Sequence, residues 1–431
     1  MKPDVVVVGG GAAGLLAALA AARGGRCVLV LEAAKDVGRK ILVSGGGRCN
    51  VLPMEDAPTR FVSESPNRLV RRFLDRWPLS SQRVFFEDFL GGPLREEPES
   101  KKLFPPSNRA KDVRDALREA VTAAGGELRE AAPVRDLVRA GEGLAVRLDG
   151  EEEIAAPRVI LATGGRSVLA GGADAAGYAW AAAMGHKVRP TYPALVPLTG
   201  DAPAQHALAG VSLAARVTAR TGKEHASSSG GFLFTHRGWS GPAVLDVSHV
   251  VERAALAGTA AEVSVCFGFG EEGREEKIAS NGPVRWARGS LAGDAAAQWD
   301  AALKGAAGSL SLLPFLRKSS LPDRLASLML EVARVPDIQL SHLSREARLR
   351  VVETLTAFPL PATGTEGYRT AEVTGGGVAL EEVDAGSGRS RLVPGLFFAG
   401  EILDAFGPIG GFNFQWAWAT GRTAGEAAAR G

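Results

Sequence analysis

Apolar residues along this chain gather into short continuous runs and into helical repeats, an alternation typical of an α/β protein. The first run, Val5–Val8, is β-branched throughout and predicts a strand that is buried on both faces. A helix-forming run over residues 15–22 follows it, and a second strand is predicted over residues 27–31. The chain therefore opens with a strand–helix–strand unit.

The next part continues with elements of ordinary length. Helices are predicted over residues 66–77, 111–124 and 174–184. A small meander of strands is predicted over residues 134–139, 144–148 and 153–156, followed by a buried strand over residues 158–165.

The pattern changes near Pro190. A β-barrel or sandwich module is predicted from β-branched and aromatic runs over residues 195–198, 214–219, 231–235 and 262–269. Helix formers then dominate, and prolines divide them into short helices over residues 277–355. The chain closes with a strand over residues 392–401 and a helix over residues 414–429.

Glycines occupy the turn between the first strand and the first helix. Gly9 permits the tight turn, Gly11 lets the backbone approach a pyrophosphate, and Gly14 lets helix and strand pack closely. The helix N-terminus then directs free N–H groups at the phosphates. Glu32 ends the second strand, 18 residues after Gly14, where a carboxylate accepts hydrogen bonds from the adenosine ribose. The unit predicts a dinucleotide site rather than a structural turn with a surface glutamate.

A second glycine cluster, residues 45–47, lies between Lys40 and Arg48 and precedes Cys49 and Asn50. Such a loop brings backbone N–H groups and cations against an anionic or electron-rich ligand. Two interpretations of Cys49 stay open. It is either a small buried apolar residue or a thiol beside the reacting centre, with a pKa lowered by Arg48 and the glycines.

The C-terminal part carries a further turn of this kind. The predicted strand ends in Gly400 and Glu401, Asp404 follows, and the glycine-rich turn at residues 407–413 opens the last helix. Because both ends of the chain carry ligand-binding turns, we expect them to come together around one cofactor. The middle of the chain is then an insertion.

Composition narrows the class of protein. In 431 residues, 50 Lys and Arg stand against 48 Asp and Glu, and the net charge of +2 is too small to indicate nucleic acid by itself. Three widely spaced cysteines predict no disulfide framework and a reducing cytoplasm, and six histidines without ligand spacing predict no metal site. The glycines of the first apolar stretch argue against a signal peptide or a membrane span.

Arginines follow the polar side of the helix predicted at residues 66–77, at Arg68, Arg71, Arg72 and Arg76. A solvated helix face is the favoured interpretation of this row, and a surface that faces RNA is the alternative.

Several specific strings carry a resemblance that runs nearly end to end. They lie at residues 9–14, 38–40, 44–50, 103–105, 162–165, 193–198, 233–236, 240–242, 371–378, 398–401 and 410–417. On these strings the chain resembles the BaiN/YhiN-type family of NAD(P)/FAD-dependent flavoproteins, relatives of the two-dinucleotide-fold oxidoreductases. The chain departs from the family pattern at residues 51–53, at residues 174–177 and at Phe412. The first two departures bear on the substrate rather than on the cofactor.

The resemblance implies an α/β fold in which a split, Rossmann-like FAD domain similar to glutathione reductase carries an inserted β-barrel and helical module. The expected parts are FAD-binding residues 1–188, a β-barrel module at 189–275, a helical module at 276–344 and FAD-binding residues 345–431. The N-terminus of the last helix is expected beside the N1/C2=O edge of the flavin, where charge accumulates on reduction. The FAD-binding residues that we infer are Gly9, Gly11, Ala12, Ala13, Gly14, Glu32, Lys40, Gly47, Arg48, Cys49, Asn50, Val134, Thr163, Gly164, Gly400, Glu401, Asp404, Gly410, Gly411, Phe412 and Asn413.

Three functions are compatible with these features. In the first, NAD(P)H reduces FAD and the flavin reduces the C5=C6 bond of a uracil in 23S rRNA to give dihydrouridine. Cys49 is then the predicted catalytic acid, which protonates the carbon that does not receive the hydride. In the second, the chain is a small-molecule oxidoreductase, such as an amine oxidase or an enone reductase. In the third, it binds FAD for a structural or redox-sensing role. The expected partner is therefore rRNA or a small-molecule substrate, with no membrane.

Overall fold

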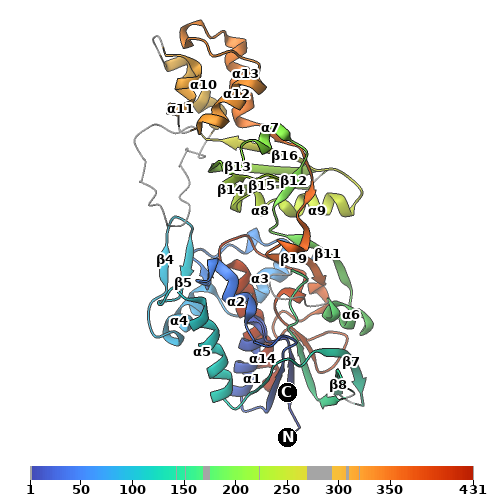
Figure 1. Ribbon diagram of the computed structural model, residues 1–431. Coiled ribbons are helices and arrows are strands. Elements are labelled where there is room, and N and C mark those ends of the chain that lie inside the picture. Colours follow the sequence, from blue (N-terminus) through green and yellow to red (C-terminus); the bar gives the residue numbers. More distant parts are fainter. Residues whose placement is uncertain are drawn as a thin grey trace. The chain divides into compact units, whose positions relative to one another are not determined.

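The structure is a computed structural model that describes residues 2–141, 143–150, 152–167, 175–222, 224–268, 294–306, 310–319 and 321–430. The chain forms two compact units, which we call unit 1 (Met1–Pro193 with Tyr368–Gly431) and unit 2 (Ala194–Gly367). The two ends of the chain therefore fold into one unit, as the blue and red segments around α1 and α14 in Figure 1 show.

A parallel sheet lies at the centre of unit 1. Its strand order is β20-β10-β1-β2-β6, and each neighbouring pair is parallel. Because helices or further strands cover both faces, the central strands contain almost only apolar residues, and β1, β2 and β20 are buried throughout. The strands are β1 (Val5–Val8), β2 (Val28–Leu31), β6 (Glu127–Arg129), β10 (Arg158–Leu161) and β20 (Leu396–Phe398).

Among the described residues of unit 1 there are seven α-helices, and α1, α5 and α14 pack on the central sheet. The helices are α1 (Ala12–Arg23), α2 (Arg39–Val43), α3 (Asn67–Asp75), α4 (Leu79–Phe89), α5 (Ala110–Ala123), α6 (Ala176–Ala183) and α14 (Phe412–Arg430).

Small residues let α1 and α14 approach closely. A Cβ added at Gly421 would lie 2.4 Å from the carbonyl oxygen of Ala13, and one at Gly425 would lie 2.2 Å from that of Ala17. Both pairs repeat at a spacing of one helical turn, so the two backbones touch along a stripe. The last helix is thereby fixed beside the first.

Three smaller sheets complete unit 1. One is a meander that packs near β10, formed by β7 (Val134–Ala140), β8 (Gly143–Leu148) and β9 (Glu153–Ala156). The others contain β3 (Leu52–Pro53), β4 (Arg95–Glu97) and β5 (Lys102–Phe104), and β11 (Val188–Ala194) with β19 (Val373–Val378).

Unit 2 contains a seven-stranded sheet in the order β17-β16-β13-β14-β15-β12-β18. The strands at its two edges, β17 (Phe358–Leu360) and β18 (Ala362–Thr365), are separated only by Pro361, so the sheet must curve to bring its edges together. This curvature is that of a barrel. The remaining strands are β12 (Leu198–Gly200), β13 (Ser212–Thr221), β14 (Glu224–Phe234), β15 (Gly238–Ser240) and β16 (Glu262–Phe267).

The helices of unit 2 fall into a group that packs on the strands of the sheet and a group whose members pack mainly on one another. They are α7 (Pro203–His206), α8 (Pro242–Leu245), α9 (Ser248–Leu256), α10 (Ala295–Gly305), α11 (Leu312–Lys318), α12 (Asp323–Ala333) and α13 (Arg345–Thr356). The sequence predicts that the second FAD-binding part begins at residue 345, whereas unit 2 extends to Gly367 in the structure. The difference arises because α13 packs on α10, α12 and β16, so its apolar face belongs to the core of unit 2.

Several strand predictions are wrong in extent. Of the strand predicted at residues 158–165, only β10 (Arg158–Leu161) forms. Residues 195–197 are not in a strand, because Leu195 has a positive φ of 51° that breaks the run after β11. The strand predicted at residues 392–401 is confined to β20, since residues 391–395 turn before it. Part of the helix predicted over residues 174–184, and the start of the helical region at residue 277, lie outside the described residues.

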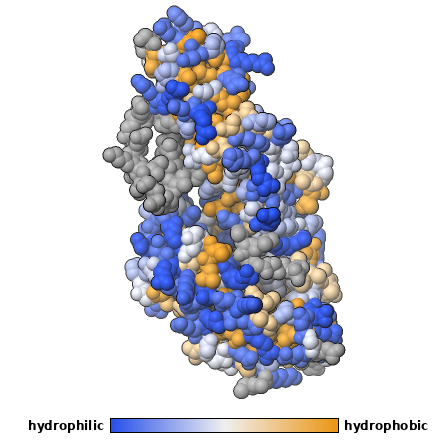
Figure 2. Space-filling model, viewed as in Figure 1, coloured by the Kyte–Doolittle hydropathy of each residue, from blue (hydrophilic) through white to orange (hydrophobic). Residues whose placement is uncertain are grey.

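On the face that Figure 2 shows, hydrophilic residues predominate among the coloured atoms, and apolar residues form smaller areas. In unit 1 the exposed large apolar side chains are Val43, Val84 and Leu392. No helix in the described part of the chain is both long and apolar enough to cross a membrane.

Candidate dinucleotide site

The predicted site residues meet at the carboxyl edge of the central sheet. Val8, the last residue of β1, pairs with both Leu31 of β2 and Leu161 of β10, and Leu161 pairs with Phe398 of β20. The residues that follow these strands therefore share one edge, where doubly wound folds bind their ligands. The register brings the loops that begin at Gly9, Glu32, Ala162 and Ala399 to this edge.

The first glycine turn has the close backbone contacts at Gly9 and Gly14 that its spacing predicts. Gly9 has a φ of 105°, and a Cβ there would lie 2.4 Å from the carbonyl oxygen of Ala162. A Cβ at Gly14 would lie 1.8 Å from the carbonyl oxygen of Gly9, so helix and turn touch. A Cβ at Gly11 meets nothing within 4 Å. Other atoms of the chain thus occupy the space beside the Cα atoms of Gly9 and Gly14, whereas the space beside the Cα atom of Gly11 is open.

The N-terminus of α1 is free to bind an anion. Gly11 is its N-cap and offers no side chain, and no acidic residue lies in the first turn. The first N–H groups of a helix have no partner within the helix, so those of Ala12 and Ala13 point out of it together with the positive end of the dipole.

Glu32, which follows β2, binds the backbone of the glycine turn. Its carboxylate accepts hydrogen bonds from the backbone N–H groups of Gly10 at 2.7 Å and Ala34 at 2.8 Å. Its carbonyl accepts one from Ala132 at 2.8 Å, which brings the segment before Val134 to the same edge. Each carboxylate oxygen has two acceptor positions, so both oxygens keep one for a further donor.

Lys40 and Glu401 join the two ends of the chain. Lys40 Nζ donates to Glu401 Oε2 at 2.5 Å, and the backbone N–H of Thr374 donates to Glu401 Oε1 at 2.8 Å. The Tyr178 hydroxyl donates to the Glu401 carbonyl at 3.2 Å. Burial, followed by the negative charge of Glu401, raises the pKa of Tyr178 well above its usual value, so this hydroxyl stays protonated.

The turn before α14 is held by its own residues. A Cβ at Gly411 would lie 2.5 Å from the backbone of Leu52, so this close approach needs glycine. Asn413 accepts from the N–H of Gly407 and donates to its carbonyl, each at 2.9 Å. Phe412 packs edge-to-face on Phe61 at 6.1 Å between ring centres. As with α1, the first N–H groups of α14 therefore face outward.

Residues of α14 also support the loop after β20. The N–H of Gly400 donates to Thr420 Oγ1 at 2.9 Å, and the indole N–H of Trp416 donates to the Gly400 carbonyl at 3.1 Å. Sequence reasoning missed these two residues and also Thr374. Thr374 and Trp416 lie within strings that carry the resemblance, whereas Thr420 had no signal other than its place in the last helix.

Of the two interpretations of Cys49, the lowered pKa is wrong, whereas the burial is observed. Cys49 is fully buried, and burial raises the pKa of its thiol to about 12, although a hydrogen bond with Ser44 opposes the shift. Arg48 instead pairs with Glu97 at 2.9 Å and lies over the ring of Phe104.

The backbone of this loop is nevertheless unusual. Cys49 has a φ of 65°, which is rare for a residue with a side chain, and Gly47 has a φ of 82°. The side-chain oxygen of Asn50 is buried and has no hydrogen-bond donor among the residues that the structure describes. Strain and an unpaired buried acceptor together are typical of a loop that binds a ligand.

The carboxylate of Asp404 is bound by the segment at residues 63–65. Its Oδ2 accepts hydrogen bonds from the hydroxyls of Ser63 and Ser65 and from the N–H groups of Glu64 and Ser65, all at 3.1 Å. Burial raises its pKa to about 6, against the opposing effect of these bonds. We therefore see Asp404 as the residue that fixes the segment from Ser63 to Ser65, a contact that sequence reasoning missed.

Thr163 and Gly164 follow β10 at the same edge. A Cβ at Gly177 would lie 2.1 Å from Thr163 Oγ1, so α6 packs directly on Thr163, and Gly164 has a φ of 74°. Gly410, with a φ of 121°, lies in the turn before α14. The structure thus brings the predicted residues of both chain ends into unit 1, with Arg48, Cys49 and Asp404 oriented differently from expectation.

A dinucleotide fits these residues. The uncapped N-terminus of α1, the open position beside Gly11, the acceptor positions of Glu32 and the unpaired oxygen of Asn50 are all features that such a ligand uses. Within the described residues, no group of three or more His, Cys, Asp or Glu side chains is arranged to hold a metal ion.

The fold and the site define an oxidoreductase of the FAD-dependent, Rossmann-type class. The chain belongs to the HI0933-like family, since the model of the HI0933-like protein Rossmann domain matches residues 3–427. This confirms the resemblance found in the sequence.

Three similar proteins extend the comparison. The chain is 31% identical over 425 residues to the ribosomal RNA dihydrouridine synthase of Escherichia coli K12, covering 97% of this chain and 96% of that protein. It is 31% identical over 423 residues to the 3-dehydro-bile acid delta(4,6)-reductase of Clostridium scindens, covering 95% of each. A crystal structure of 3-ketosteroid-delta4-(5alpha)-dehydrogenase from Rhodococcus jostii RHA1 has a TM-score of 0.52 at 16% identity, covering 99% of this chain and 97% of that one. This last likeness concerns the fold alone.

Proposed function

We propose that this chain uses FAD, reduced by NAD(P)H, to reduce the C5=C6 bond of a uridine in 23S rRNA to dihydrouridine. The observation that carries the proposal is the full-length match to a ribosomal RNA dihydrouridine synthase, because 97% of this chain aligns with 96% of that protein. A match of this extent includes both units, not only the dinucleotide fold that many enzymes share.

We assign the binding of FAD to the carboxyl edge of the central sheet. The N–H groups at the start of α1 would face the pyrophosphate, and Glu32 would accept hydrogen bonds from the ribose. The N-terminus of α14, with Gly411 and Phe412, would face the flavin. The remaining inferred contacts, from Lys40 and the loop Gly47–Asn50 to Thr163, Gly164, Gly400 and Glu401, complete the site.

When bound, FAD supplies the hydride for the electron-poor carbon of the uracil double bond. The chain must then provide the proton for the other carbon. Cys49 Sγ is our candidate for this role, since its raised pKa keeps the thiol protonated throughout the neutral range. Its burial means that the loop at residues 45–50 has to open toward the substrate for the proton to transfer.

The C-terminal segments of the site would stabilise negative charge on the bound flavin. The positive end of the α14 dipole would stabilise negative charge that develops beside it, and Lys40 adds a positive charge that Glu401 holds in place.

A second candidate function is the reduction of a conjugated ketone. It is favoured by the equally extensive match to a bile acid reductase, at the same 31% identity. The chemistry is closely related, because a uracil and an enone both accept hydride at the carbon β to a carbonyl group.

One experiment separates the two functions. The enzyme is reduced anaerobically with NADPH or NADH and mixed with a protein-free 23S rRNA fragment or with an enone. Reoxidation of the flavin by the RNA, with dihydrouridine formed in it, is the expected result. Reoxidation only by the enone would replace the proposal with the second function.

A further inference from the structure

Unit 1 carries a row of arginines that the candidate dinucleotide site does not use. Arg68, Arg71, Arg72 and Arg76 are all exposed on or directly after α3. Arg71 lies 3.9 Å from Asp75, whereas no carboxylate of a described residue pairs with the other three. Unpaired guanidinium groups in a row make a locally positive surface on a chain with a net charge of only +2.

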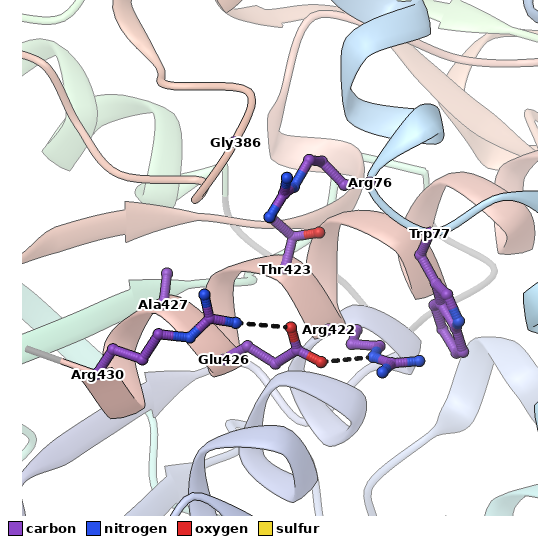
Figure 3. A pocket seen from close by; sticks show the side chains of 8 residues that line it. All are labelled: Arg76, Trp77, Gly386, Arg422, Thr423, Glu426, Ala427 and Arg430. Atoms are coloured by element: carbon purple, nitrogen blue, oxygen red, sulfur yellow. Dashed lines mark hydrogen bonds and ion pairs between the residues drawn. The ribbon is translucent and has the colours of Figure 1, made fainter.

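The row ends at a cavity of about 70 Å³ between the C-terminal end of α3 and α14. Arg76 enters it from one side, and Arg422 and Arg430 from the other (Figure 3). One water needs roughly 10–15 Å³ of such a cavity, so a group of the size of a phosphate can enter.

The guanidinium groups in this cavity are oriented in advance. Glu426 accepts from Arg422 Nε at 2.7 Å and from Arg430 at 3.2 Å, and Arg422 also lies 4.6 Å from the ring centre of Trp77. One carboxylate thus positions two guanidiniums, and the three arginines leave a net charge of two positive units. Each guanidinium has five N–H donors, so donors remain for an external oxyanion.

The arrangement suits a polymer of phosphates better than a single anion. At about 1.5 Å per helical residue, Arg68 lies about 12 Å from Arg76 along the helix direction. The arginines of α3 therefore extend the positive surface beyond the cavity, and together with the cavity they form a strip. By the same rise, Arg422 lies about 17 Å from Gly411 at the start of α14, so this end of the strip is remote from the start of that helix.

We propose that this strip, which consists of Arg68, Arg71, Arg72, Arg76, Arg422 and Arg430, binds the phosphodiester backbone of the RNA substrate. The choice of RNA as the polymer rests on the proposed function. Contacts of this type fix register and carry no sequence information, so base recognition remains the task of the reacting site.

The test compares two triple variants of the full-length holoenzyme. The first is Arg68→Gln with Arg72→Gln and Arg76→Gln, which removes three unpaired charges from the strip. The control is Arg135→Gln with Arg139→Gln and Arg147→Gln, which removes three charges from the meander of unit 1. Binding of a protein-free 23S rRNA fragment is measured over a series of salt concentrations, with flavin content and melting temperature as checks on folding.

We expect the strip variant to bind the RNA at least about tenfold more weakly at low salt. Its slope of log K against log salt should fall in magnitude by about 2 to 3, and the control should keep the wild-type values. Wild-type affinity and slope in the strip variant would overturn the proposal, as would wild-type protein that does not bind RNA. Strip-dependent binding without dihydrouridine formation would support the docking surface and contradict the proposed function alone.

Discussion

Lys40 and Glu401, which are 361 residues apart in the chain, form an ion pair with 2.5 Å between Nζ and Oε2. The pair joins the segment after β2 to the loop after β20. The side chains of Lys40 and Glu401 are both largely buried. It is therefore a direct link between the two chain ends that form unit 1.

Removing this link should loosen the site without unfolding the chain. For Glu401→Gln we expect a loss of about 1–2 kcal/mol in the free energy of unfolding, because the hydrogen bond from Thr374 remains while the charge is lost. FAD should bind more weakly. Urea denaturation and flavin titration measure the two effects, and unchanged values in both would contradict the assigned role.

Gly11 and Gly14 allow a matched comparison. Gly11→Ala should leave the apo protein as stable as the wild type, since nothing lies within 4 Å of the added Cβ, yet abolish FAD binding by blocking the pyrophosphate. Gly14→Ala should destabilise even the apo protein by about 1–3 kcal/mol or more, because its Cβ would lie 1.8 Å from the carbonyl oxygen of Gly9.

Thermal unfolding of both apo variants, with flavin titration of the stable one, measures this difference. Normal FAD affinity in Gly11→Ala would contradict the proposed position of the pyrophosphate beside Gly11.

Asp404 should make stability depend on pH. Its pKa rises from an ordinary 3.8 to about 6 in the folded chain, so the folded state holds this proton more tightly than the unfolded state. The stabilising effect is complete below about pH 4 and is lost as the pH rises through 6, an overall change of about 3 kcal/mol. Asp404→Asn lacks this titration.

The measurement is urea denaturation of the apo wild type and of Asp404→Asn between pH 4 and pH 8. The wild type should lose stability relative to the variant as the pH rises. A constant difference between the two proteins would show that Asp404 has an ordinary pKa.

Cys49 should be required for the reduction of rRNA but not for the binding of FAD. Cys49→Ala is expected to keep its FAD and to lose reduction of rRNA, whereas Cys27→Ala, at another free cysteine, keeps both. Because the pKa of Cys49 is about 12, its ionisation should not reduce the rate between pH 7 and about pH 10. Wild-type turnover in Cys49→Ala would leave Cys49 as a buried packing residue, the other interpretation of its sequence context.

Local pattern was enough to predict most of unit 1. The run Val5–Val8, the glycine turn and Glu32 are close in sequence, and their roles follow from strand burial and backbone geometry. Where the prediction failed, the cause was not local. The pKa of Cys49 is raised by burial among distant segments, and Arg48 pairs with Glu97, which lies 49 residues away in the chain.

Asp404 shows the same limit. The sequence predicts Asp404 as a cofactor contact, but it does not predict that the carboxylate accepts hydrogen bonds from Ser63 and Ser65, more than 300 residues earlier. Such a pairing depends on tertiary structure and has no signature in a single sequence.

The binding of FAD by the two chain ends is the central claim, and reconstitution tests it most directly. The purified chain is incubated with FAD, separated from free flavin by gel filtration, and assayed for bound flavin per chain beside Gly11→Ala. We predict about one FAD per wild-type chain and none in the variant. A wild-type protein that stays colourless, or a variant that binds equally well, would contradict the account.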